Sequence, residues 1–465
     1  MNTRLESDSI GTLEIPADAY YGVQSLRAKR NFPITGAPMH TSFIKNLARI
    51  KKAAAVTNQK AGELSPEKAQ AIEAACDEII NGALHDQFIV DAIQGGAGTS
   101  ANMNANEVIA NRAIELCGGV KGDYSIVHPN DHVNMAQSTN DVIPSAGKLT
   151  ILDLLPGLMS ELQRLEEALI IKSAEFDHIL KMGRTQLQDA VPMRLGQSFH
   201  SYASVIRRDI QRLMNCRNEL YTINLGGTAI GTAINVSAYY LNHVVLNLSE
   251  ISGHPLKQAD DLFDATENLD GFVVTSDTLK ACAVNLSKMC NDLRLLSSGP
   301  CTGLGEINLP AMQNGSSIMP GKINPVIPEV VTQVAFQVIG NSSVVTMAAE
   351  AGQLELNAFE PVIFYNLFSA ITAMTGAVKT LVDNCITGIT ANEEYCHSLV
   401  DKSVGIVTAL CPVIGYQKAS AIAKKSLKTG KSIVTLVLEE KILTHDQLTE
   451  LLDPRAMTVP HRVEA

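Results

Sequence analysis

The segment that most constrains function is GSSIMPGKIN, residues 315–324. It gathers two serine hydroxyls, the ammonium group of Lys322 and the amide of Asn324 in one short stretch. Gly315 and Gly321 tolerate positive φ, and the proline between them fixes its own φ, so the composition predicts a loop. A loop that concentrates hydroxyl, ammonium and amide groups predicts a site for a small anion. A lone Gly-Ser-Ser would more often be an ordinary polar turn.

Three further polar clusters accompany this loop. They are GTSANMNANE at 98–107, QSTND at 137–141 and GRTQLQDAVP at 183–192. Each lies where the helical period of the apolar residues breaks, as expected for binding residues carried on loops by a rigid scaffold. Taken singly, each cluster is more often a helix cap or a turn, because Thr, Ser and Asn are the preferred cap residues. Their combination with the 315–324 loop favours a chemical role.

Other familiar motifs fail on spacing. The 315–322 segment has one residue too many between its glycines for a P-loop, and Ile323 replaces the required Ser or Thr. GGAGTSA lacks the third glycine of the dinucleotide-binding fingerprint. His128 and His132 are four residues apart, but the residues between them predict a turn, and no HExxH occurs. We therefore expect no catalytic metal. The NLGGTAIGT segment, 224–232, predicts a backbone turn with close helix packing.

Long amphipathic helices are the elements expected to position these clusters. Apolar residues three and four positions apart mark one face of a helix. Several such helices must bury their apolar faces against one another, which predicts a helical bundle. The apolar period is clearest in the segments 158–169, 205–214, 279–296, 326–350 and 353–390.

Length and composition fit a helical protein of several domains. The 465 residues exceed one ordinary core. A hydrophobic fraction of 46% with 18% charged residues indicates a folded, soluble chain, and the absence of Trp favours helical packing over a β sandwich. We predict a mostly helical N-terminal domain at 1–139, a central helical-bundle domain with the polar loop at 140–394, and a small C-terminal helical domain at 395–465.

The net charge and the cysteine pattern indicate which binding partners and which cellular compartment to expect. The net charge of −11 argues against a nucleic-acid or anionic-membrane surface, but not against a small anionic substrate. The nine cysteines form no CxxC, so reduced thiols are expected rather than a disulfide framework or a zinc ribbon. The N-terminus lacks the apolar core of a signal peptide. We expect a cytoplasmic protein that binds no nucleic acid and no membrane.

The four clusters, in this order, resemble the fumarase/aspartase superfamily, and GSSIMPGKIN is similar to its signature loop. The similarity covers essentially the whole chain, starting at LESDSIGTLEIPADAYYGVQSLRA, 5–28. QSTND and GGAGTSANMNANEV are similar to the aspartase versions, whereas class II fumarases usually carry QSSND. Fumarases typically have His after the Thr of the third cluster, but here Gln186 follows Thr185. A neutral amide cannot titrate as His does, so the aspartase branch is favoured.

The resemblance implies a mainly α, three-domain fold whose central long-helix bundle forms the multi-helix core of a homotetramer, with active sites shared between three subunits. It implies reversible conversion of L-aspartate to fumarate and ammonia, which is a carbon–nitrogen lyase reaction. It implies no organic cofactor and leaves a divalent activating cation open. The alternatives are a class II fumarase, which adds water to fumarate, and, further away, a non-catalytic crystallin-like protein on the same scaffold.

The resemblance also implies residue roles. Ser316 matches the general base that removes the proton from C3 of the substrate. Lys322 and Asn324 match the anchors of the α-carboxylate, assisted by Thr185. The positions that match donors to the β-carboxylate are Thr99, Ser138, Thr139 and Ser317. The positions that match neighbours of the amino group are Asn140 and Gln186. Met319 of the loop is the remaining substrate-binding position.

Overall fold

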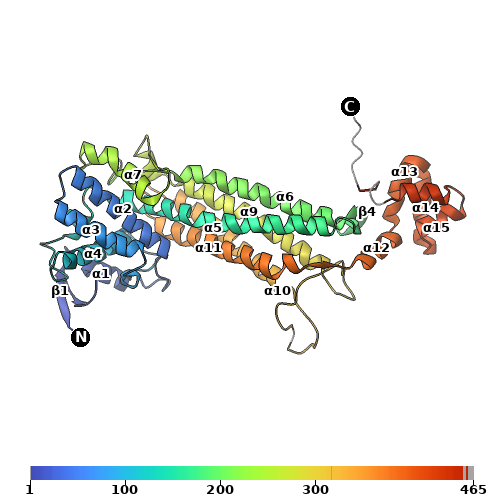
Figure 1. The fold of residues 1–465 in the computed structure, drawn as a ribbon, viewed down its shortest axis with the longest axis horizontal. Coiled ribbons are helices and arrows are strands. Elements are labelled where there is room, and N and C mark those ends of the chain that lie inside the picture. Colours follow the sequence, from blue (N-terminus) through green and yellow to red (C-terminus); the bar gives the residue numbers. More distant parts are fainter. Residues whose placement is uncertain (1, 316, 454–456, 459–465) are drawn as a thin grey trace. The chain divides into compact units, whose positions relative to one another are not determined.

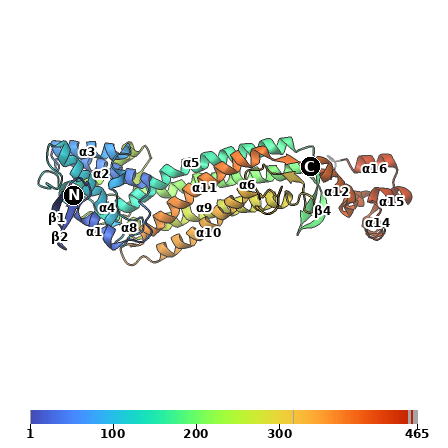
Figure 2. The same cartoon turned by 90° about the horizontal axis from the view of Figure 1, so that it is seen from below.

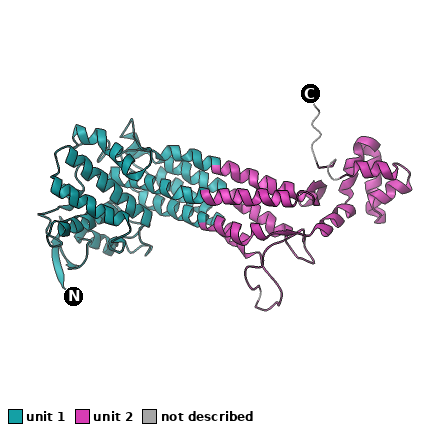
Figure 3. Cartoon of the chain, in the orientation of Figure 1, with its two compact units in different colours: residues 1–159, 211–283, 334–375 teal, residues 160–210, 284–333, 376–465 magenta. Residues whose placement is uncertain are grey.

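The structure is a computed structural model that describes residues 2–315, 317–453 and 457–458. Over these residues the fold is mainly helical, as predicted, and the strands form four two-stranded sheets (Figures 1 and 2). The chain divides into two compact units (Figure 3). Unit 1 comprises residues 1–159, 211–283 and 334–375, and unit 2 comprises residues 160–210, 284–333 and 376–465. The three domains predicted at 1–139, 140–394 and 395–465 stay a prediction.

The first polar cluster lies on one of three neighbouring helices of unit 1. Helix α2 packs against α3 and α4, and its small alanine side chains at 53–55 are buried. Helix α4 begins directly after Gly98, whose φ of +87° glycine adopts without steric cost. The elements of this part are the antiparallel strands β1 (Thr3–Ser7) and β2 (Thr12–Pro16) and the helices α1 (Val23–Asn31), α2 (Thr41–Lys60), α3 (Pro66–Ile80), α4 (Thr99–Leu116), α7 (Ala238–Ser252) and α8 (Asp264–Glu267).

Five long helices correspond to the segments predicted for the bundle, and the division between the units falls within each of them. In unit 1, Gly147 of α5 leaves room for the ring of Phe364 of α11, which also contacts the ring of Phe272 of α9 at a centroid distance of 5.2 Å. In unit 2, Asn285 of α9 donates to Asp209 of α6 at 2.9 Å. The helices are α5 (Thr139–Glu175), α6 (Leu195–Cys216), α9 (Asp270–Leu296), α10 (Val326–Glu350) and α11 (Glu360–Asn384).

The last predicted bundle segment, 353–390, begins too early. Helix α11 starts at Glu360, and the residues before it form a turn. The buried side chain of Asn357 holds this turn, since it donates to the carbonyls of Ala348 and Ala349 at 2.9 and 3.0 Å and accepts from the N–H of Phe359 at 2.8 Å. One amide therefore ends α10 and starts α11, which apolar periodicity cannot reveal.

A hairpin and a group of short helices make up the remainder of unit 2. Buried Leu180 and Met182 of the hairpin share a hydrophobic cluster with Leu410, Ile422 and Leu436. This packing fixes the base of the hairpin and leaves its turn at the other end. The elements are β3 (Leu180–Thr185) and β4 (Gln188–Arg194), α12 (Glu393–Lys402), α13 (Val407–Ile414), α14 (Tyr416–Thr429), α15 (Ile433–Glu439) and α16 (His445–Leu451); the short pairs elsewhere are β5 (Thr222–Ile223) with β6 (Lys257–Gln258) and β7 (Ile307–Asn308) with β8 (Thr390–Ala391).

Within the described residues, three helices, α5, α10 and the helix that begins at Glu360, are long and apolar enough to cross a membrane by length and composition, and the bent pair Glu393–Lys402 with Val404–Ile414 would count as a fourth span. The most apolar window of α5 is 72% buried inside the structure and that of the third helix 61%, so their apolar side chains are covered by the chain itself. The corresponding window of α10 is only 39% buried. Its apolar surface includes Val330, Phe336 and Met347.

Candidate active site

The QSTND cluster caps the start of α5 and is fastened by its aspartate. The buried carboxylate of Asp141 accepts from the N–H of Ser138 at 2.9 Å through one oxygen. Its other oxygen accepts from the N–H groups of Gly226 and Thr228, each at 3.0 Å. Burial raises the pKa of Asp141 to about 6, although these three donors oppose the shift. The carboxylate thus holds QSTND and the 224–232 loop together.

The 224–232 loop belongs to this site, although the sequence predicted only a turn. The side-chain amide of Asn140 donates to the carbonyl of Ala229 at 2.7 Å, and Asn224 donates to the carbonyl of Asn140 at 3.0 Å. Since the NH₂ of Asn140 is engaged, its Oδ1 is the atom that could accept from a substrate ammonium group. The glycine-rich NLGGTAIGT composition was the available signal: a Cβ on Gly231 would lie 2.6 Å from the backbone nitrogen of Phe263.

The first cluster meets the second through Asn102. Thr99 is exposed at the start of α4, where its hydroxyl donates to the carbonyl of Gly96 at 2.7 Å. One helical turn later, the amide of Asn102 donates to Oγ1 of Thr139 at 3.3 Å. Four predicted substrate residues, Thr99, Ser138, Thr139 and Asn140, therefore lie in unit 1 around the starts of α4 and α5.

The last residue of the first cluster has a structural role. The buried carboxylate of Glu107 accepts from the N–H groups of Gly22, Gln24 and Ser25 at 2.8, 2.9 and 3.1 Å. Burial raises the pKa of Glu107 to about 7. This carboxylate fastens the first turn of α1 to α4 and takes no part in the candidate site.

A cavity of about 140 Å³ lies beside Thr99, and Ser100 and Arg27 also line it. Arg27 forms an ion pair with Asp8, with its Nη2 2.8 Å from Oδ1 and its Nε 3.0 Å from Oδ2. Arg27 was not among the predicted site residues. Its position within the 5–28 segment was the only signal.

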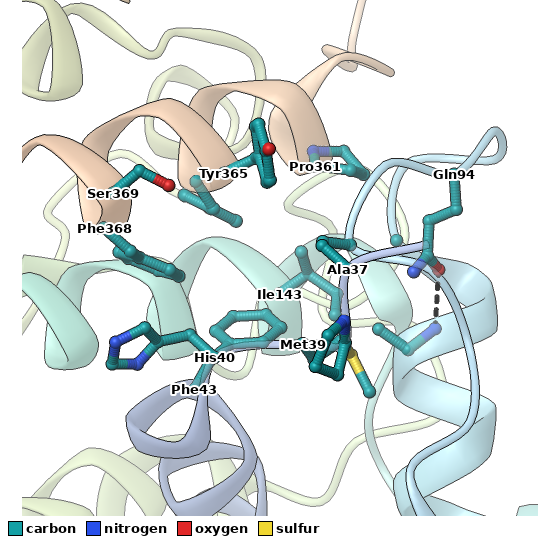
Figure 4. Close-up of a pocket in the computed structure, with 15 residues that line it drawn as sticks. Ala37, Met39, His40, Phe43, Gln94, Ile143, Pro361, Tyr365, Phe368 and Ser369 are labelled. Atoms are coloured by element: carbon teal, nitrogen blue, oxygen red, sulfur yellow. Dashed lines mark hydrogen bonds between the residues drawn. The ribbon is translucent and has the colours of Figure 1, made fainter. Parts of the chain in front are cut away.

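A larger cavity of unit 1, about 290 Å³, lies between the 37–43 segment and α11 (Figure 4). Its wall is mainly apolar and includes Met39, Phe43 and Phe368. His40 also lines it, but burial lowers the pKa of this imidazole, which favours its neutral form. None of the predicted substrate residues lines this cavity, and its wall lacks the cation that a dicarboxylate requires.

Thr185 and Gln186 occupy the turn of the β3–β4 hairpin in unit 2. Thr185 pairs with Gln188, so the turn has only Gln186 and Leu187 at its centre. Both central residues have positive φ, 54° and 61°, where Asn and Gly are preferred. The hairpin is anchored by Arg184, whose Nη1 lies 2.6 Å from Oε1 of buried Glu306. Two exposed side chains in a strained turn are characteristic of a functional position.

The 315–324 segment is a loop over its described residues, as predicted. Gly321 has a φ of +82°, but Gly315 is needed for a different reason from the one expected. A Cβ there would lie 1.2 Å from the carbonyl oxygen of Lys322, so the two ends of the loop touch. Ser317, Met319 and Lys322 are exposed, and Asn324 lies two residues before the start of α10, with Pro325 between them. Ser316, the predicted base, lies outside the described residues.

The predicted site residues thus form two groups. Unit 1 holds the four named above, and the structure joins them through Asn102 and the 224–232 loop. Unit 2 holds Thr185 and Gln186 in the hairpin turn and Ser317, Met319, Lys322 and Asn324 in the loop. Their roles toward a substrate stay predictions.

Comparison with known proteins places the chain in a family. Residues 11–340 match the family described as Lyase, and residues 406–459 match the one described as Fumarase C C-terminus. The chain is 54% identical to the aspartate ammonia-lyase of a Bacillus species over 462 residues, which cover 99% of each chain. It is 48% identical to the aspartate ammonia-lyase of Escherichia coli, over 99% of this chain and 97% of that one.

Solved structures agree in fold. A fumarate lyase:delta crystallin from Brucella melitensis bound to cobalt matches with a TM-score of 0.96 and 51% identity, over 99% of this chain and all of that one. A class II fumarase from Schistosoma mansoni matches over the same shares with a TM-score of 0.95 and 35% identity. The chain therefore belongs to the fumarase/aspartase superfamily, within its aspartate ammonia-lyase family.

Proposed function

We propose that this chain catalyses the reversible deamination of L-aspartate to fumarate and ammonia. The observation that carries the proposal is the identity with aspartate ammonia-lyases over essentially the full length, 54% over 462 residues for the Bacillus relative. Gln186, in place of the His that is typical of fumarases, supports ammonia as the leaving group rather than water.

The main chemical requirement of this reaction is a set of hydrogen-bond donors around the β-carboxylate, and the base comes second. The proton on C3 is very weakly acidic, and its removal places a second negative charge on the β-carboxylate, which becomes an aci-carboxylate. Preorganised donors around those oxygens supply the largest stabilisation, and one donor contributes about 10²–10³ in rate. Thr99, Ser138, Thr139 and Ser317 take this role.

Ser316 removes the proton from C3. A serine hydroxyl is a poor base unless its alkoxide is stabilised, so loop N–H groups and a cation must lie nearby. Lys322 and Asn324 anchor the α-carboxylate with help from Thr185. Oδ1 of Asn140 and the side chain of Gln186 lie toward the amino group, and Met319 completes the substrate contacts of the loop. Loss of ammonia from the aci-carboxylate then gives fumarate.

The working enzyme is a cytoplasmic homotetramer in which three subunits contribute to each active site. The low burial of α10 supports an association between chains, because Phe336 and Met347 leave 63% and 62% of their surfaces exposed in the single chain. No organic cofactor takes part. A divalent cation acts at most as an activator, and among the described residues no group of three or more His, Cys, Asp and Glu could hold one.

A product assay tests the function. Purified protein is incubated with fumarate in the presence and absence of ammonium, and the products are identified by mass. We expect aspartate only when ammonium is present. Malate as the main product would assign the chain to the fumarases, and a well-folded tetramer without turnover would favour the crystallin-like alternative.

A further inference from the structure

A fully buried lysine lies beneath the candidate site. Lys51 of α2 has no exposed surface, and its ammonium group donates to Oδ1 of Asn102 at 2.7 Å and to Oδ1 of Asn134 at 2.8 Å. No mechanistic role proposed above uses this lysine. A buried amine is costly unless its hydrogen bonds are well placed, so the two amide oxygens that receive them need an explanation.

The lysine determines which way the Asn102 amide faces. A lysine amine offers hydrogens in both its charged and its neutral form, so the atom of Asn102 that faces it is the acceptor Oδ1. The NH₂ group then points away, where it donates to Oγ1 of Thr139 at 3.3 Å and to Oδ1 of Asn134 at 3.2 Å. Asn134 is oriented in the same way, and its own NH₂ donates to the carbonyl of Gln137 at 3.2 Å.

The orientation of the Asn102 amide determines where the hydroxyl hydrogen of Thr139 can point. Because Asn102 donates to its oxygen, one lone pair is occupied and the hydroxyl hydrogen is left to point elsewhere. A carboxylate can only accept hydrogen bonds, so a threonine that binds one must present its hydrogen. The opposite amide orientation would place Oδ1 of Asn102 against Thr139 and draw the hydroxyl hydrogen inward.

We propose that Lys51 and Asn102 are positioning residues, which fix the Thr139 hydroxyl as a hydrogen-bond donor toward the β-carboxylate of the substrate. The inference rests on the proposed function to the extent that Thr139 binds this carboxylate. It adds a series of hydrogen bonds that runs from Lys51 through Asn102 to Thr139. Lys51 and Asn102 are buried and do not touch the substrate. Stabilisation of the aci-carboxylate depends on these hydrogen bonds, because the negative charge that develops on the substrate is greatest in the transition state.

The decisive variant is Asn102→Asp. It keeps the size of the side chain and gains an ion pair with Lys51, but a carboxylate cannot donate to Thr139 and instead accepts from it. We expect kcat to fall about 10²-fold with a smaller change in KM, because the lost interaction acts mainly in the transition state. Thr139→Val, which removes the hydroxyl, should lower kcat by a similar factor.

The double variant separates positioning from general damage. In the Thr139→Val background, Asn102→Asp should lower kcat by no more than about threefold, because there is no hydroxyl left to orient. Equal losses in the two backgrounds would overturn the proposal, since they would indicate charge repulsion or loss of structure. A folded Asn102→Asp enzyme with wild-type kcat would overturn it as well.

Asn104→Asp is the matched control. Asn104 is also buried on α4, but its amide bonds the carbonyl of Gln87 and the N–H of Ile89, away from Thr139. We expect a lower Tm and a kcat within about twofold of wild type.

If Asn102→Asp does not fold, Lys51→Met replaces it in the same cycle, because it frees the Asn102 amide to turn. Malate as product would refute the proposed function and leave this inference testable, since both reactions start from a carboxylate that Thr139 must bind.

Discussion

At the scale of single residues, the roles of Ser316 as the base and Lys322 as the α-carboxylate anchor in the 315–324 loop can be tested separately. Ser316→Ala should lower kcat by at least about 10²-fold with little change in substrate affinity, because it removes the base and leaves the anchors. Lys322→Ala should mainly raise KM, because it removes the charge that binds the α-carboxylate. Steady-state kinetics with aspartate measures both. A Ser316→Ala enzyme of near-full activity would refute the assignment of the base.

Lys51 also predicts a pH dependence of stability. Burial lowers its pKa to about 7 in the folded chain, whereas an unfolded chain has the ordinary value of about 10.4. Between these two values the unfolded state binds more protons, so the free energy of unfolding should rise with pH. Lys51→Met removes this contribution.

The difference in stability between wild type and Lys51→Met should therefore change between pH 7 and pH 9 by up to about 2 kcal/mol, in favour of wild type at the higher pH. Thermal unfolding of the two proteins across this range measures it as a widening gap in Tm. Parallel Tm curves would mean that the folded-state pKa of Lys51 is not lowered.

At the scale of elements, the packing of α5 against α11 depends on a glycine. A Cβ on Gly147 would lie 2.2 Å from the ring of Phe364, so Gly147→Ala forces the helix or the ring to move. We expect a loss of about 1–3 kcal/mol in the free energy of unfolding, seen as a lower Tm. Gly157→Ala on the same helix is the control: nothing lies within 4 Å of its Cβ, so it should raise stability by about 0.5–1 kcal/mol. Equal effects of the two substitutions would contradict the packing argument.

At the scale of the whole molecule, α10 predicts self-association. Phe336→Glu places a charge on its exposed apolar face, and we expect the proposed tetramer to dissociate and activity to fall at least about 10-fold, because the proposed site takes residues from three subunits. Light scattering after size-exclusion chromatography measures the mass, and the assay is run on the same fractions. Leu427→Glu on α14, where the leucine is 73% exposed, should leave both unchanged. A tetrameric and active Phe336→Glu enzyme would remove α10 from the interface.

The sequence by itself determined the features that depend on near neighbours along the chain. The period of the apolar residues predicted the long helices, and the glycines and proline of GSSIMPGKIN predicted the loop, because helical faces and φ preferences are set within a few residues. Resemblance in four short motifs was enough to predict the family, which the comparisons confirmed.

Only the tertiary structure decided the contacts between distant segments. Asp141 fastens a loop more than 80 residues further along, Gly315 is required because the carbonyl of Lys322 crosses it, and Asn357 rather than apolar periodicity sets the start of α11. Buried Lys51 likewise orients Asn102 across 51 positions of sequence. These choices depend on which groups are buried together and must satisfy one another's hydrogen bonds, and that is known only once the helices have packed.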